Sequence, residues 1–120
     1  MEGTFLRFYV HEKHRHDGVL LWQWMLKQAN QMGLRGGSAF RAMAGFGRHH
    51  KLHEDHFFEL AGSLTVEVEF IVTEAERVAL LDLLEREKIR AFFAEIPARF
   101  GIINPDPGDG TAPPRVENPT

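Results

Sequence analysis

The sequence predicts one α+β domain whose elements follow the order β-α-β-β-α-β, and three patterns predict it. Residues 64–70 alternate apolar and polar side chains, as the half-buried strands of an antiparallel sheet do. Residues 5–10 combine aromatic and β-branched side chains, which favour a strand. Residues 19–32 instead repeat apolar side chains every three or four positions, which is the period of a helix.

In the first half of the chain, residues 11–16 form a charged connector, and Asp17 is a suitable N-cap for the helix at 19–32. Gly33 follows the last periodic residue, where a glycine commonly ends a helix. A weaker strand pattern follows at 36–45, weaker because alanine and methionine do not favour strands. The expected buried face of the helix consists of Leu21, Met25, Ala29 and Met32.

In the second half, the strand at 64–72 leads into Thr73 and Glu76, whose spacing is typical of a capping box at the start of a helix. We expect this helix over residues 74–87 and a last strand over 89–96, which Pro97 ends. The expected inward face of the helix consists of Val78, Leu81 and Leu84.

Two crossover units that share one antiparallel sheet predict a ferredoxin-like βαββαβ sandwich with two helices on one face. If Leu6, Phe8 and Val10 face the helices, Phe5 and Tyr9 lie on the opposite face. An aromatic sheet face on a domain this small usually binds a partner, and self-association would also cover the strand edges.

The chain divides into a folded domain at 1–103 and a tail at 104–120. Five of the six prolines lie in the tail, which has almost no apolar side chains. Such a composition buries too little surface to offset ordering, so we expect the tail to be disordered.

The composition is ordinary for a soluble globular domain: 43% of residues are hydrophobic and 26% are charged. The absence of cysteine excludes disulfides and thiolate metal sites, and no apolar run reaches the roughly 18 residues of a membrane span. The net charge of -3 argues against a nucleic-acid-binding protein. We therefore expect a cytoplasmic protein without membrane insertion.

The turn formed by Gly45, Phe46, Gly47 and Arg48 is the strongest candidate for a binding motif. Glycines allow a ligand or a second chain to approach the backbone closely. An arginine side chain can donate paired hydrogen bonds to a phosphate or a carboxylate. The sequence therefore favours an anionic ligand near this turn.

A histidine-rich loop follows the turn and offers a second candidate site. His49, His50, His53 and His56 lie within eight positions, beside two acidic residues. Imidazoles and carboxylates suit divalent transition metals, although polar loops of this kind are more often solvated or interfacial. The remaining histidines, at 11, 14 and 16, lie in the charged connector and are a weaker metal candidate.

The order of elements, the turn at 45–48, the long loop after it and the strand at 64–72 resemble the PII signalling superfamily. The resemblance is strongest to its PII-like branch, a domain-of-unknown-function family, and covers residues 4–103. It implies a homotrimer with the sheets inside, and ligand sites in clefts between subunits. It also implies that the loop after Gly47 is the mobile loop that contacts an effector or a target protein.

The resemblance also implies which residues contact the ligand. Gly45, Phe46, Gly47 and Arg48 match the turn that lines the adenine-nucleotide cleft. Lys88 resembles the phosphate-contacting lysine before the last strand, and Arg99 resembles a basic residue of the C-terminal phosphate-binding loop. Residues 84–87 contain two glutamates where PII proteins have a glycine-rich loop, which favours a nucleotide smaller than a triphosphate or no nucleotide at all.

Three functions remain as hypotheses. The first is a non-enzymatic regulatory protein that binds a small anionic effector, an adenine nucleotide above all, and presents its loop to a target protein. The second is a trimeric divalent-metal-binding protein that uses the histidines of residues 49–56. The third is an enzyme with a histidine base between subunits, for which the sequence offers no nucleophile motif or catalytic partner.

Overall fold

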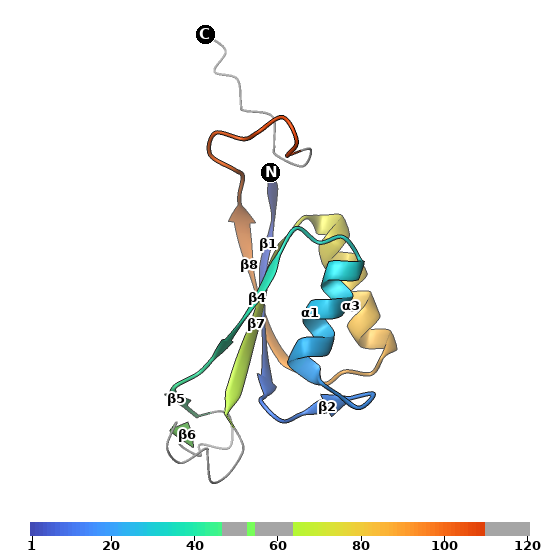
Figure 1. The fold of residues 1–120 in the computed structure, drawn as a ribbon, viewed down its shortest axis with the longest axis vertical. Coiled ribbons are helices and arrows are strands. Elements are labelled where there is room, and N and C mark those ends of the chain that lie inside the picture. The colour runs from blue at the N-terminus through green and yellow to red at the C-terminus, as the bar shows by residue number, and fades with distance from the viewer. Residues whose placement is uncertain (47–52, 55–63, 110–120) are drawn as a thin grey trace.

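The computed structural model describes residues 1–46, 53–54 and 64–109. Two helices, α1 and α3, cover one face of a four-stranded sheet (Figure 1). The strands lie in the order β4-β7-β1-β8, and every neighbouring pair is antiparallel. The elements are β1 (Glu2–His11), α1 (Leu21–Gln31), β4 (Gly37–Arg41), β7 (Thr65–Val72), α3 (Glu74–Arg86) and β8 (Phe92–Arg99).

Each helix connects two strands that are separated in the sheet by a third strand, so the predicted ferredoxin-like βαββαβ sandwich is confirmed. The predicted orientation of β1 is also confirmed, because Leu6, Phe8 and Val10 are buried toward the helices. Phe8 meets Phe70 of β7 edge to face, with ring centroids 6.2 Å apart. The alternating side chains of these two central strands therefore build most of the sheet's contribution to the core.

The predicted helix start was wrong. Asp17 is not an N-cap but the first turn residue of a small hairpin between β2 (Arg15–His16) and β3 (Val19–Leu20). Asp17 and Gly18 both have positive φ angles, of 52° and 78°, as a two-residue type I′ hairpin turn requires. Helix α1 therefore begins at Leu21, and the connector at 11–16 contains a strand.

The end of α1 follows the prediction. Gly33 has a φ of 83°, and its N–H donates to the carbonyl of Asn30. The N–H of Leu34 donates to Ala29, which completes a Schellman motif. On the predicted apolar face Leu21, Met25 and Ala29 are buried, but Met32 is not, because it lies in the C-terminal cap and is 37% exposed.

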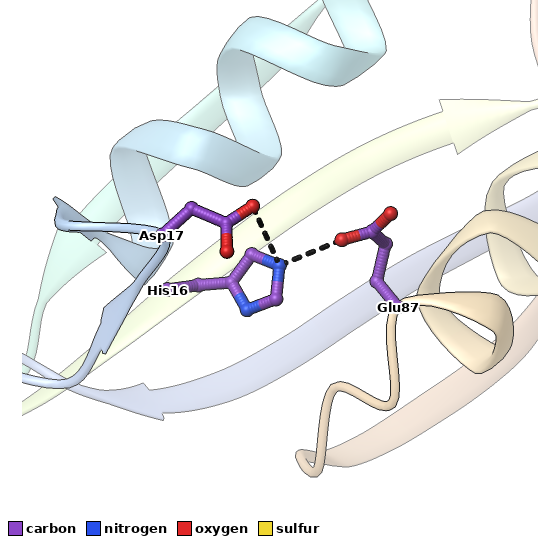
Figure 2. Close-up of side chains that lie close together, drawn as sticks. All are labelled: His16, Asp17 and Glu87. Atoms are coloured by element: carbon purple, nitrogen blue, oxygen red, sulfur yellow. Dashed lines mark hydrogen bonds and ion pairs between the residues drawn. The ribbon is translucent and has the colours of Figure 1, made fainter.

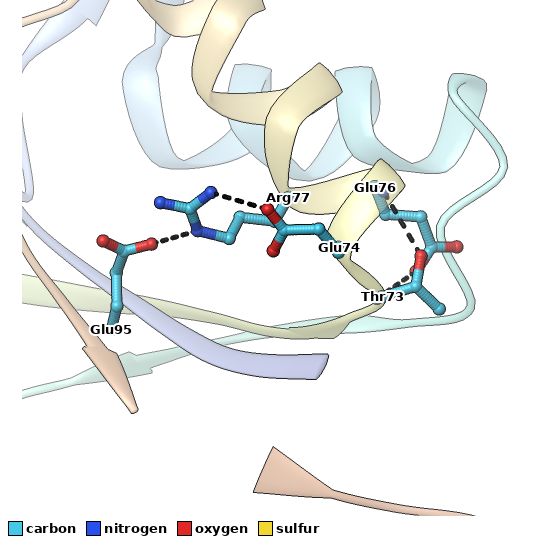
Figure 3. Close-up of polar contacts among 5 residues, drawn as sticks. All are labelled: Thr73, Glu74, Glu76, Arg77 and Glu95. Carbon is cyan, nitrogen blue, oxygen red and sulfur yellow. Dashed lines mark hydrogen bonds and ion pairs between the residues drawn. The ribbon is translucent and has the colours of Figure 1, made fainter. Parts of the chain in front are cut away.

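Helix α3 begins with the predicted capping box (Figure 3). The N–H of Glu76 donates to Thr73 Oγ1 over 3.3 Å, and the N–H of Thr73 donates to Glu76 Oε1 over 2.8 Å. The predicted inward face was partly wrong, since Val78 is 53% exposed and Leu80 is fully buried. Leu84 is buried as predicted.

The strand predicted at 36–45 is divided in two. β4 covers Gly37–Arg41 and pairs with β7, whereas β5 (Ala44–Gly45) leaves the main sheet and pairs with β6 (His53–Glu54). Figure 1 shows this small ribbon beyond one end of the main sheet.

The predicted limits of the last strand were wrong at both ends. The N–H of Ile89 donates to Leu84 and so belongs to the cap of α3, which delays β8 to Phe92. Pro97 does not end the strand but pairs with Thr4 inside it. An edge strand tolerates proline because one side of its backbone has no neighbour in the sheet, and β8 is such a strand.

Of the tail, residues 104–109 are described, and the remaining residues lie outside the described ranges. Within the described residues, no helix is both long and apolar enough to cross a membrane.

Candidate functional site

The glycine turn begins at the β5–β6 ribbon. Gly45 of the predicted binding turn pairs with His53 of the histidine-rich loop. A Cβ added to Gly45 would meet no atom within 4 Å, and the φ of this residue is not positive. Phe46 beside it is 66% exposed. The described fold thus has room for a side chain at 45, and the glycine there leaves the backbone open to a ligand.

Several predicted site residues lie outside the described residues: Gly47, Arg48, His49, His50 and His56. The structure describes His53 only as part of β6. Both the arginine contact and the alternative metal site at 49–56 therefore stay predictions.

Lys88 ends α3 in a left-handed conformation with a φ of 57°. Its N–H donates to Glu85 over 3.0 Å, and the N–H of Ile89 donates to Leu84 over 3.0 Å, which makes a second Schellman motif. Glycine normally occupies this position, because a Cβ costs about 1–2 kcal/mol in left-handed backbone. A strained residue of this kind is more frequent at functional sites.

The sheet separates the predicted phosphate contacts within one chain. Arg99 pairs with Glu2 at one end of β8, and Lys88 precedes the other end. Eight residues of strand span roughly 25 Å. Gly45 and Lys88 lie at the same end of the sheet, but they follow β4 and precede β8, which are the two edge strands. One compact ligand can contact all three positions only if neighbouring chains supply some of them.

A polar cluster that the sequence did not predict lies beside Lys88. His16, Asp17 and Glu87 bring one ligand atom each to within 4.8 Å of the others (Figure 2). His16 Nε2 lies 2.8 Å from Glu87 Oε1 and 3.6 Å from Asp17 Oδ2. The cluster thus joins the β2–β3 hairpin to the end of α3.

Part of this cluster was readable from the sequence. The dipeptide Asp17-Gly18 is the typical signal for a type I′ hairpin, and it would have placed His16 in a strand. No sequence signal links His16 to Glu87, because the two residues lie 71 positions apart and meet only through the tertiary fold.

A second polar group fastens α3 to β8 (Figure 3). Arg77 donates a hydrogen bond to Glu95 of β8 and lies 3.3 Å from Glu74 in its own helix. The hydrogen bond with Glu95 raises the pKa of Arg77 above its ordinary value, so the guanidinium stays charged. All three acidic and basic groups have partners, and we interpret this group as structural.

Among the described residues, no helix covers the second face of the sheet, and this face carries several aromatic side chains. Tyr9 lies opposite Phe92 on the neighbouring strand, and Phe5 lies opposite Ile96. Phe92 is 74% exposed and Ile96 is 53% exposed. Arg7 crosses the same face and lies 2.8 Å from Glu69. We refer to Phe5, Tyr9, Phe40, Phe92 and Ile96 as the open face.

The sequence of the chain decides its family. The family DUF190, described as "Uncharacterized ACR, COG1993", matches residues 3–91. The chain belongs to DUF190. A UPF0166 protein from Aquifex aeolicus (strain VF5) is 32% identical over 104 residues, which cover 86% of this chain and 88% of that protein.

The fold of this DUF190 protein resembles a solved PII structure. That structure is described as CPII bound to ADP and bicarbonate, from Thiomonas intermedia K12. The TM-score is 0.51 at 18% sequence identity, with 82% of this chain and 89% of that chain covered. Together these matches confirm the predicted resemblance: the chain belongs to DUF190 and has the ferredoxin-like fold of a PII protein.

Proposed function

We propose that this DUF190 protein is a homotrimeric, non-enzymatic regulator that binds a small anionic effector between subunits. The effector would be an adenine nucleotide. The segment after Gly45 would adopt a particular conformation when the effector binds, and a target protein would recognise that conformation. The observation that carries the proposal is the placement of Gly45 and Lys88 at one end of the sheet on opposite edges. Such a placement suits a cleft that two chains build together.

The exposed side chains of the open face support the proposal of a homotrimer. Phe92, Ile96 and Phe40 are each more than half exposed, although fully burying a side chain of this size contributes about 1.5–3 kcal/mol. A domain whose helices cover one sheet face (Figure 1) and whose other face carries exposed aromatic side chains is suited to pack that second face against copies of itself. Packing around a threefold axis also brings edge strands of neighbouring chains together.

The backbone conformation of Lys88 supports the proposal of an anionic ligand. Its left-handed backbone would be relaxed by glycine, so the lysine side chain has a cost to stability at this position. An ammonium group there would donate charge-assisted hydrogen bonds to a phosphate. The ADP in the PII structure of similar fold supports the choice of nucleotide class.

Regulation would follow from differential binding. An effector held by Lys88 of one chain, and by Arg48 and Arg99 of neighbouring chains, would favour the loop conformation in which these contacts are made. A target that recognises this conformation would then sense the effector. No covalent step is needed.

Isothermal titration calorimetry with ADP, AMP and ATP tests the proposal. Lys88→Ala and Arg48→Ala should each weaken ADP binding about tenfold or more, since a charge-assisted hydrogen bond contributes roughly 1.5–3 kcal/mol. Lys27→Ala is the matched control, because it removes the same charge from the exposed surface of α1. Equal ADP affinity in the parent, the control and both variants would contradict the proposed site.

A further inference from the structure

The cluster of His16, Asp17 and Glu87 supplies no ligand contact to the proposed nucleotide site, yet its three side chains point toward one another (Figure 2). Two carboxylates face the same imidazole nitrogen, Nε2. A single ion pair would need only one of them. The arrangement therefore raises the question of what a second carboxylate does there.

The distances fit a small metal ion. Bonds of about 2.1 Å to a tetrahedral ion hold neighbouring ligand atoms roughly 3.4 Å apart. The two distances from His16 Nε2, 2.8 and 3.6 Å, lie on either side of that value. A small rotation of each carboxylate would equalise them, which is feasible because the Asp17 and Glu87 side chains are 73% and 39% exposed.

The imidazole is held in place before any ion binds. His16 lies in β2, whose pairing with β3 fixes its backbone, and Arg15 Nη1 donates to the carbonyl of Gly18 across the turn. The His16 ring packs against the Trp24 ring at a centroid distance of 4.6 Å and an angle of 69°. Trp24 is itself buried in the core. A rigid imidazole loses little entropy on binding a ligand.

The charges also favour a cation. With a neutral imidazole the cluster carries two negative charges, which match a divalent ion. Glu87 is the C-cap of α3, so the negative end of the helix dipole lies beside the cluster. Imidazole together with carboxylate oxygen suits divalent transition metals.

We propose that His16 Nε2, Asp17 Oδ2 and Glu87 Oε1 bind one divalent transition metal ion. Three protein ligands leave at least one coordination position for water. The ion would replace the proton that Nε2 now donates to Glu87, and it would join the β2–β3 hairpin to the end of α3 immediately before Lys88. This site is distinct from the histidine-rich loop at 49–56 and does not depend on nucleotide binding.

Cobalt(II) titration of the full chain, followed by its visible absorption, tests the proposal. The parent should bind one equivalent, and His16→Ala and Glu87→Gln should each weaken binding at least tenfold. The matched controls are His14→Ala, in the same connector, and Glu85→Gln, an exposed carboxylate at the same helix end. Both controls should bind as the parent does. Glu87→Gln keeps an oxygen that can accept the hydrogen bond from His16, so its loss of cobalt separates metal binding from the ion pair.

A variant with alanine at 49, 50, 53 and 56 separates this site from the histidine-rich loop. This variant should still bind the one equivalent of cobalt(II) that the His16→Ala variant fails to bind. If the equivalent disappears with the loop histidines and survives His16→Ala, the proposal is wrong. It is equally wrong if the parent binds no cobalt at millimolar concentration.

Tryptophan fluorescence gives an independent readout in the Trp22→Phe variant, where Trp24 is the remaining tryptophan. Paramagnetic cobalt at His16 would lie next to the Trp24 ring, so the emission should fall as the ion binds. The added change His16→Ala should abolish the saturable quenching. Quenching that persists unchanged without His16 would place the ion elsewhere and contradict the assignment.

Discussion

His16 Nε2 donates a hydrogen bond of 2.8 Å to Glu87 Oε1, across 71 positions of sequence. This contact ties the β2–β3 hairpin to the C-terminal cap of α3. It therefore fixes the segment that carries Lys88, the described residue on which the proposed anion site most depends.

The first prediction concerns this contact. In the presence of a chelator, His16→Ala should lower the free energy of unfolding by about 1 kcal/mol, because it removes the hydrogen bond and the packing against Trp24. A double-mutant cycle with Glu87→Ala should give a coupling of about 0.2–1 kcal/mol, as partly exposed pairs do. Urea denaturation measures both quantities. His14→Ala should change neither, and a coupling of zero would show that the pair is not formed in solution.

The second prediction concerns the backbone of Lys88. Lys88→Gly should raise the free energy of unfolding by about 1 kcal/mol, because glycine adopts positive φ without the cost of a Cβ. Lys88→Ala is the control, since it removes the charge but keeps the Cβ, and it should not stabilise the protein. Both variants should lose affinity for ADP. A glycine variant that is less stable than the alanine variant would contradict the left-handed conformation.

The third prediction concerns two adjacent glycines. A Cβ at Gly37 would lie 2.5 Å from the buried Phe70 ring, whereas a Cβ at Gly36 would meet nothing within 4 Å. Gly37→Ala should therefore destabilise the protein by about 1–3 kcal/mol, as overpacking of a core does. Gly36→Ala should be neutral or slightly stabilising. Thermal unfolding of the two variants checks the contrast, and equal melting temperatures would show that β4 does not pack on Phe70 as described.

Much of the fold was predictable because local patterns and tertiary structure agree there. The alternation in β7 and the Thr73 capping box needed no knowledge of distant residues. The buried face of α3 was harder, since Leu80, Leu81, Leu83 and Leu84 are all apolar and the choice of face depends on the sheet. The passage of β8 through Pro97 depends on its position at the sheet edge, which sequence does not state.

The candidate site was less predictable than the fold. The glycine-rich turn itself indicated Gly45 and the family resemblance indicated Lys88, whereas the separation of Lys88 from Arg99 became clear only from the strand order and register. The cluster at His16 was missed because Asp17 was assigned to a helix cap when it forms a hairpin turn. Contacts between distant segments leave no pattern in a single sequence.

The fourth prediction concerns the open face. Ile96→Lys places a charge on the sheet face that is proposed to pack between subunits, and it should dissociate the assembly because an unpaired charge is costly to bury. Val78→Lys is the matched control, since Val78 and Ile96 are both 53% exposed but Val78 lies on α3. The control should assemble as the parent does. Dissociation of both variants to the same extent would show that the open face has no special role.

The proposed effector site exists only between chains, so the molar mass in solution tests the account most directly. Light scattering of the purified protein at micromolar concentration should give three times the 13.7 kDa of one chain. A stable mass of 13.7 kDa under the same conditions would contradict the account, because no second chain would then bring Gly45 and Lys88 to one ligand.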